Sequence, residues 1–163
     1  MTIRVDPTAR VSSRCDLEDS TRGTQIVIGA RSIVDSFVKI KPAGGTGDLY
    51  IGEDTVLNSG CVLYTGNGIY IGSNVAIAAN CVLAPVNHAF ADASRLIRHQ
   101  GFQVGRGGIV IEDDVWIGAA CVILDGARVR RGAVIGAMSL VRGEVEPLTI
   151  NVGNPLRQIG VRR

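Results

Sequence analysis

Two histidines are the only imidazoles in the chain, and both lie in one stretch that interrupts an otherwise regular sequence. His88 ends the aliphatic run IGSNVAIAANCVLAPVNH (residues 71–88), and His99 follows it in SRLIRHQG. An imidazole has a pKa near neutrality and can take the proton of a hydroxyl nucleophile in the transition state, an effect of about 10²–10⁴-fold. A lone loop histidine is by default a solvated residue, so its role depends on the elements that hold it.

A repeat of six residues runs through most of the chain. From Ile71 every sixth residue is Ile77 and then Leu83, and from Ile111 the series continues unbroken to Val141. Because six fits neither the period of a helix nor that of a long strand, it predicts short strands separated by corners. The eighteen aliphatic positions of the series are Val5, Val11, Leu17, Ile28, Val34, Ile40, Ile51, Leu57, Leu63, Ile71, Ile77, Leu83, Ile111, Ile117, Ile123, Val129, Ile135 and Val141.

Three six-residue units make one triangular coil, with the aliphatic residue of each unit pointing inward. We therefore predict an all-β fold, a parallel β-helix of about six coils that stack about 4.8 Å apart. The spacing leaves the handedness open. With 21 glycines and few aromatic residues, the composition also favours tight turns and short strands over packed helices.

Length and charge exclude several classes of protein. The 163 residues suit one domain, 1–163, and the net charge of +2 is spread evenly, without a basic patch for nucleic acid or an anionic membrane. The N-terminal MTIRVDPTAR lacks the apolar core of a secretory signal, and no apolar run reaches the roughly 18 residues of a membrane helix. We expect a cytoplasmic protein without a membrane span.

The four cysteines follow the repeat. Each lies four residues after the middle aliphatic of a coil, where Val38 and Ser139 stand in two other coils. That register predicts a column of small, buried, reduced thiols, with neither the spacing of a metal site nor a disulfide framework. The four are Cys15, Cys61, Cys81 and Cys121.

Insertions interrupt the repeat, and they are where function is expected because the coils hold their ends still. The long loop 84–108 follows the fourth coil and carries both histidines, and residues 142–163 form a C-terminal tail. The shorter insertions KPAGGTGD (41–48) and YTGNG (64–68) predict glycine turns. GGTG as a phosphate cradle is the weaker interpretation, because no helix N-terminus follows it.

The repeats, the loop after NCVLAPVNH, the restart IEDDVWIGAACVI and the ending VIGAMSLVRGEVEPLTINVGNPLRQI resemble the hexapeptide-repeat acyltransferases. The likeness runs from about Ile51 to the end and is strongest to galactoside and maltose acetyltransferases and to sugar O-acetyltransferases of polysaccharide synthesis. It implies a left-handed β-helix, a homotrimer with active sites between adjacent prisms, and acetyl-CoA as the donor to a small carbohydrate acceptor.

The resemblance also implies site residues. His88 matches the general base, Asn58 matches an asparagine that contacts the acceptor hydroxyl, and Trp116 would flank the acetyl or acceptor pocket. The alternatives are a turn-capping role for Asn58 and packing of Trp116 under the long loop. His99, among charged residues in what reads as a short exposed helix, is expected to be a solvated residue.

On the donor side, the resemblance places pantetheine along the small corner residues Ala119 and Ala137. Arg157 matches an arginine near the CoA phosphates, and Arg142 is a further candidate. Two departures from the family pattern leave the acceptor and the phosphate contacts open. An acidic residue expected near Gly66 is missing, and Gly160 stands where a second arginine is expected.

Other readings of the sequence remain. A metal enzyme of the carbonic anhydrase type shares this prism but needs three histidine ligands, one more than the chain has. A noncatalytic trimeric scaffold needs neither His88 nor a CoA groove. Within the enzyme class, the acceptor could be the amine of an amino sugar or an antibiotic, because the same base serves N- and O-acetylation.

Overall fold

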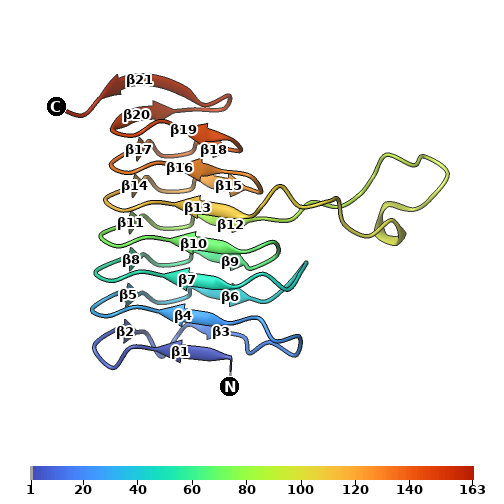
Figure 1. Ribbon diagram of the computed structural model, residues 1–163, viewed down its shortest axis with the longest axis horizontal. Coiled ribbons are helices and arrows are strands. Elements are labelled where there is room, and N and C mark those ends of the chain that lie inside the picture. The colour runs from blue at the N-terminus through green and yellow to red at the C-terminus, as the bar shows by residue number, and fades with distance from the viewer. Residues whose placement is uncertain (1) are drawn as a thin grey trace.

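The computed structural model describes residues 2–163 as a triangular prism of short strands (Figure 1). Its three faces are sheets A, B and C. Sheet A contains β1 (Ile3–Val5), β4 (Ile26–Ile28), β7 (Leu49–Ile51), β10 (Ile69–Ile71), β13 (Ile109–Ile111), β16 (Arg128–Val129) and β19 (Glu144–Val145). Sheet B contains β2 (Arg10–Val11), β5 (Ile33–Val34), β8 (Val56–Leu57), β11 (Ala76–Ile77), β14 (Trp116–Ile117), β17 (Val134–Ile135), β20 (Thr149–Val152) and β21 (Arg157–Val161). Sheet C contains β3 (Asp16–Leu17), β6 (Lys39–Lys41), β9 (Val62–Tyr64), β12 (Val82–Ala84), β15 (Val122–Leu124) and β18 (Leu140–Val141).

The strands stack in parallel and in the register that the repeat predicts. Ile71 lies beside Ile51 on one side and beside Ile111 on the other, although Ile111 comes 40 positions after Ile71 in the sequence. The chain passes through A, B and C in turn, which makes six complete coils of a left-handed parallel β-helix. The predicted fold class is therefore confirmed.

The core is a column of the predicted aliphatic side chains. Every one of these positions after the first coil is at most 1% exposed, whereas Val5 of the first coil is 41% exposed because no strand of this chain lies beneath it. Each buried Val, Leu or Ile contributes about 1.5–3 kcal/mol of hydrophobic stabilisation. The column fixes the axial position of every corner.

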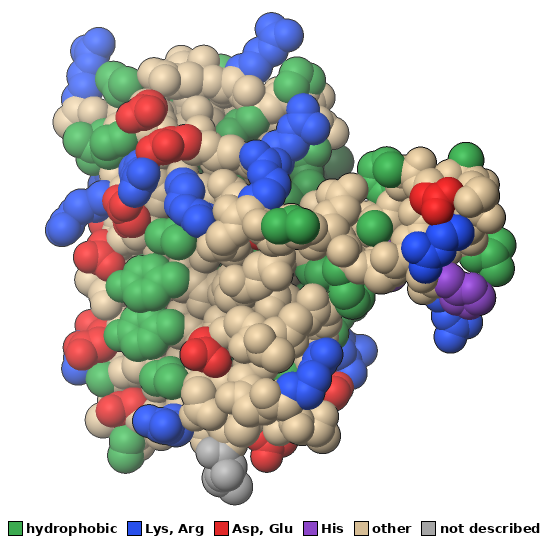
Figure 2. Space-filling view, turned by 45° about the vertical axis from the view of Figure 1, so that its right-hand side comes forward, with side chains coloured by type: hydrophobic (Ala, Val, Ile, Leu, Met, Phe, Trp, Pro, Cys, Tyr) green, Lys and Arg blue, Asp and Glu red, His purple; other side chains and the backbone are tan. Residues whose placement is uncertain are grey.

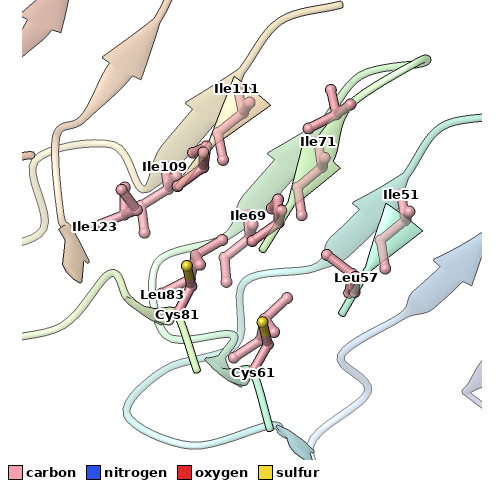
Figure 3. Close-up of a cluster of buried hydrophobic side chains, with 14 of the residues drawn as sticks. Ile51, Leu57, Cys61, Ile69, Ile71, Cys81, Leu83, Ile109, Ile111 and Ile123 are labelled. Atoms are coloured by element: carbon pink, nitrogen blue, oxygen red, sulfur yellow. The ribbon is translucent and has the colours of Figure 1, made fainter. Parts of the chain in front are cut away.

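The cysteines lie in this column as predicted. Cys61, Cys81 and Cys121 are fully buried, Cys15 is half-buried, and all four are free thiols. Figure 3 shows the sulfur atoms of Cys61 and Cys81 among aliphatic side chains of adjacent coils. The Cys81 thiol donates to the carbonyl oxygen of Gly118 at 3.2 Å, so the weak polar group is satisfied inside the prism.

The corners turn through backbone in the left-handed region. Between sheets B and C the same corner position is occupied by Asn80 (φ 61°), Ala120 (φ 56°) and Met138 (φ 60°) in successive coils. This conformation is uncommon for residues other than glycine and costs about 1 kcal/mol or more each. The stacked coils maintain it, so the corner between sheets B and C, the BC edge, is a rigid line.

The C-terminal residues continue the prism. β19 and β20 are two strands of a seventh coil, and β21 folds back antiparallel on β20. Asn151 takes the place next to Ile135 that an aliphatic residue has in lower coils. The helical content of residues 2–163 is one 3-10 turn, η1 (Ile97–His99), and none of it could cross a membrane.

Candidate functional site

The long loop leaves the corner between sheets C and A, the CA edge, between β12 and β13. The middle of the loop stands clear of the prism, with hydrophobic side chains along its surface (Figures 1 and 2), whereas Pro85 and Gly108 at its two ends are buried. The loop has a two-stranded stem in which the Ala89 N–H donates to the Gly101 oxygen at 3.0 Å and the Gln103 N–H to the Asn87 oxygen at 2.8 Å. The stem places its side chains at fixed positions beside the CA edge.

His88 lies in this stem, four residues beyond the end of β12. Its backbone forms a bridge with Phe102, and the two rings pack with centroids 4.9 Å apart. The side chain is exposed, and no group in residues 2–163 is hydrogen-bonded to its nitrogens. An imidazole that is held by one ring face and has free nitrogens can accept a proton from a bound ligand.

His99 is different. It ends η1 at the outer part of the loop, where Arg95 donates to its backbone oxygen at 2.6 Å. The predicted short exposed helix is therefore present as one 3-10 turn, and none of its residues is buried.

The foot of the loop is fixed by residues that sequence reasoning missed. Asp125 is 4% exposed, and its carboxylate accepts from the N–H groups of Arg106 at 2.7 Å and Gly108 at 2.9 Å. The Arg128 guanidinium donates to the oxygens of Gly107 and Gly108, both at 2.9 Å. In the sequence, Asp125-Gly126 reads only as a turn signal, because the amides that it binds come from the far end of the loop.

The BC edge carries Asn58, Ala119 and Ala137. The two alanines are exposed, and their N–H groups have no hydrogen-bond acceptor in residues 2–163. Ser59 and Ala79 present unpaired N–H groups at the same corner of lower coils. Small side chains and free amides thus form one line, to which a ligand with amide carbonyls could bind without obstruction.

Asn58 uses part of its side chain to close its own corner. Its Nδ2 donates to the Ile77 oxygen at 2.9 Å, as its backbone N–H also does. This is the turn-capping role that the sequence left open. The Oδ1 atom has no donor in residues 2–163 and remains available to a ligand.

Trp116 points outward from β14 on sheet B and is 54% exposed. Its strand pairs with Ala76 and Val134 on the two sides. Sheet B lies opposite the CA edge in the prism, so the loop of the same chain does not cover the indole. Packing of Trp116 under the long loop of another copy stays a prediction.

The two candidate arginines lie at different places in the C-terminal segment. Arg142 follows β18 at the CA edge and borders a hollow with Asn151 and Asn154, whereas Arg157 begins β21 on sheet B. Both side chains are exposed, and neither forms an ion pair within residues 2–163. Arg162, by contrast, pairs with Asp114 at 2.9 Å.

The predicted site residues therefore fall on two edges. Asn58, Ala119 and Ala137 lie together on the BC edge, while His88 stands off the CA edge. Within the described chain, no three His, Cys, Asp or Glu side chains are placed to hold a metal ion.

The sequence matches two models of hexapeptide repeats. Residues 108–143 match the bacterial transferase hexapeptide, and residues 49–85 match the hexapeptide repeat of succinyl-transferase. These segments cover the coils on both sides of the long loop.

Curated relatives match over parts of the chain. A chloramphenicol acetyltransferase of Escherichia coli is 48% identical over 56 residues, which is 34% of this chain and 27% of that protein. A probable acetyltransferase of Mycobacterium tuberculosis is 32% identical over 117 residues, 72% of this chain and 38% of that protein. The chain thus spans between about a quarter and two fifths of these relatives' own length.

Solved structures share the prism. A maltose O-acetyltransferase from Clostridium difficile is 29% identical, covers 83% of this chain and 69% of its own, and superposes with a TM-score of 0.68. AntD, an N-acyltransferase from Bacillus cereus in complex with dTDP and coenzyme A, is 22% identical, covers 98% of this chain and 84% of its own, and has a TM-score of 0.81. With the matched repeats and the six stacked coils, these findings show that the chain belongs to the hexapeptide-repeat acyltransferase superfamily.

Proposed function

We propose that the protein is an acetyltransferase that moves an acetyl group from acetyl-CoA to a hydroxyl of a carbohydrate. The observation that carries the proposal is the line of exposed alanines with unpaired N–H groups on the BC edge, inside the segment that matches the transferase repeat. The pantetheine arm of acetyl-CoA has two amide carbonyls on a narrow chain. Such an arm fits a line of small residues with free donors.

His88 supplies the base. As the acceptor oxygen attacks the thioester carbonyl carbon, its proton passes to the free imidazole nitrogen. The C–S bond then breaks, the acetyl group stays on the acceptor, and the imidazolium returns the proton to the CoA sulfur. Packing against Phe102 and the fixed foot at Asp125 orient the imidazole for this transfer.

The two halves of the site lie on different edges, so we propose that they meet between copies in a homotrimer. The loop carries five large apolar side chains that are at least half exposed, and Val104 reaches 94%. Sheets B and C also show outward aliphatic ladders, such as Val62, Val82 and Val122 on C. Apolar surface of this kind favours a covering partner. The five loop residues are Phe90, Leu96, Ile97, Phe102 and Val104.

In this arrangement the loop of one copy lies over the BC edge of the next. His88 then faces the line of Ala119 and Ala137, and the exposed Trp116 of that copy borders the pocket. Arg142 and Arg157 are the proposed contacts to the CoA phosphates, because both are exposed cations without an ion pair in residues 2–163. Reduced, buried thiols and acetyl-CoA both fit a cytoplasmic enzyme.

A thiol-release assay tests the proposal. The protein and acetyl-CoA are incubated with maltose, nucleotide-linked sugars, amino sugars, chloramphenicol and serine. Release of CoA thiol that depends on a hydroxylated sugar is the expected result. Release only with amines would support N-acetylation, the second candidate, which agrees with the identity of 45% over 51 residues to a tetrahydropyridine-dicarboxylate N-acetyltransferase of Staphylococcus aureus. No release with any acceptor would support a noncatalytic scaffold.

A further inference from the structure

A pair of stacked tyrosines stands on the outer face of sheet A. Tyr50 and Tyr70 lie side by side on β7 and β10, with ring centroids 5.2 Å apart and planes within 7°. They are 40% and 46% exposed. Their neighbours along the sheet are the shorter Val27 and Val110, so the rings form a ridge with accessible apolar surface beside it.

Polar groups with free hydrogen-bonding capacity surround this ridge. A shallow hollow beside the rings is also lined by Asp48, Asn67 and Val110. Asp48 accepts the Gln25 N–H through Oδ1 and Asn67 donates to Asp125 through Nδ2, which leaves Asp48 Oδ2, Asn67 Oδ1 and both phenol groups without partners in residues 2–163. The hollow therefore offers several hydrogen-bonding atoms next to two aromatic rings.

The glycine insertions extend the hollow towards the loop. A second hollow shares Asn67 with the first and is floored by glycines of residues 44–47 and 64–68. A side chain at Gly45 would collide with the backbone of Gly66, so close stacking of the turns requires glycine here. The result is a bare trough from the tyrosine pair to the foot of the loop that carries His88.

The lining of these two hollows indicates the chemistry of the ligand. Neither hollow is lined by a lysine or arginine. The nearby Arg128 guanidinium already donates to the oxygens of Gly107 and Gly108, so no cation of the lining is placed to pair with a phosphate group. Aromatic faces with carboxylate and amide oxygens beside them suit a neutral ring that has an apolar face and hydroxyl donors. A sugar ring has both properties.

We propose that Tyr50, Tyr70, Asp48 and Asn67 form a subsite for one unit of a neutral oligosaccharide, and that the glycine trough directs the next unit towards the loop. The sugar-binding part stands on the geometry of sheet A alone. The assignment of this oligosaccharide as the acetyl acceptor rests on the proposed function.

Titration calorimetry without acetyl-CoA tests the subsite. The probes are maltotriose, cellotriose and triacetylchitotriose, with dTDP as the charged comparison. We expect one of the trisaccharides to bind and dTDP not to compete with it. Loss of one stacking ring, in Tyr50→Ala or Tyr70→Ala, should weaken binding by roughly fivefold to tenfold.

Phe37→Ala is the matched control, because Phe37 is an exposed aromatic residue between β5 and β6 and lines neither hollow. It should bind the trisaccharide as the parent does. Tyr70→Leu keeps apolar packing on the sheet and should still weaken binding, which separates ring loss from misfolding. The proposal is overturned if the parent binds none of the three trisaccharides, or if both Tyr50 and Tyr70 variants bind like the parent.

The same proteins separate this subsite from the proposed function. Trisaccharide binding that depends on the tyrosines, without thiol release from acetyl-CoA, would refute the proposed function and retain the subsite. Acetylation of sugars with an unchanged KM in both tyrosine variants would retain the function and refute the assignment of this subsite to the acetyl acceptor.

Discussion

The BC edge and the CA edge of the prism differ in regularity: one is a line of similar corners, and the other carries insertions and a projecting loop. The BC edge is made only of corners, with backbone held in the left-handed conformation and small side chains that expose free N–H groups. The CA edge carries the glycine insertions and the loop of residues 85–108, whose outer part contacts little of its own chain. A rigid line suits the binding of an extended ligand, whereas a projecting stem suits the delivery of a side chain to a neighbouring molecule.

The comparison teaches that the two halves of the proposed site lie apart within one chain. His88 projects from one edge and the Ala119–Ala137 line lies on another, so the proposed chemistry needs a second copy. The following substitutions test each edge in turn.

Removal of the imidazole should have the largest effect. His88→Ala should lower turnover by about 10²–10⁴-fold, because the acceptor hydroxyl loses its base. The KM for acetyl-CoA should change little, since its pantetheine arm is assigned to the BC edge and its phosphates to Arg142 and Arg157. Steady-state thiol-release kinetics measure both quantities.

His99→Ala is the control for this loop, because His99 is exposed at its outer end. It should stay within about threefold of the parent, as expected of a surface substitution. If the His88 variant keeps the parental turnover under conditions where chemistry limits the rate, His88 is not the base and the loop at the CA edge has no catalytic role.

Obstruction of the BC edge should weaken the binding of acetyl-CoA and leave the base in place. Ala137→Trp places a large ring over the line of free amides, and we expect the KM for acetyl-CoA to rise by about tenfold or more. Ala30→Trp changes a similar corner between sheets A and B and should leave this KM unaltered. Equal effects of the two substitutions would show that bulk at any corner is damaging, and would contradict a donor line on the BC edge.

Loosening of the loop foot should have a smaller effect. In Asp125→Asn the amide nitrogen would face one of the backbone N–H groups that the carboxylate now binds. An unpaired buried donor costs about 1–3 kcal/mol, so we expect faster hydrogen exchange at Gly108 and turnover lower by about tenfold. Asp92→Asn, in the outer loop, is the control and should change neither the hydrogen exchange at Gly108 nor the turnover. Unchanged hydrogen exchange at Gly108 in the Asp125 variant would refute the anchoring role of Asp125.

Replacement of a core thiol should leave turnover unaffected. The contact with Cys121 lowers the pKa of the Cys81 thiol. Hydrogen bonding with Cys61 and burial raise this pKa by a larger amount, so that it lies at about 11. The thiol is therefore protonated at neutral pH and a poor nucleophile. Cys81→Ala should lower the free energy of unfolding by about 1–3 kcal/mol in urea denaturation. Loss of turnover in a folded Cys81→Ala variant would contradict the packing role.

The repeat made the prism predictable because stacking of identical coils turns a sequence period directly into a buried column. Ile71 and Ile111 could be paired across the long loop for that reason. Residues 142–163 kept less of this signal, because the spacing shifts after Val141 and Asn151 stands in an aliphatic place. The sequence therefore indicated a tail where β19, β20 and β21 are formed.

The candidate site was predictable only in part. The six-residue repeat indicates which corner a residue occupies, so Ala119 and Ala137 could be placed on one line. Asp125 and Arg128 could not be found, because their partners are backbone groups of a loop whose path no period determines. The Tyr50–Tyr70 pair was also missed, since it shows only once the register of β7 and β10 is known.

Mixed oligomers test most directly whether the two edges meet between copies. His88→Ala and Ala137→Trp chains are produced together, and thiol release is measured at an acetyl-CoA concentration well below the KM, where each variant alone has about a tenth or less of the parental activity. If each site takes His88 from one copy and the BC edge from the next, random trimers regain about a quarter of the parental activity, because a quarter of the interfaces have both native residues. Activity no higher than that of the two separate variants, in oligomers shown by mass spectrometry to contain both chains, would contradict a site shared between copies.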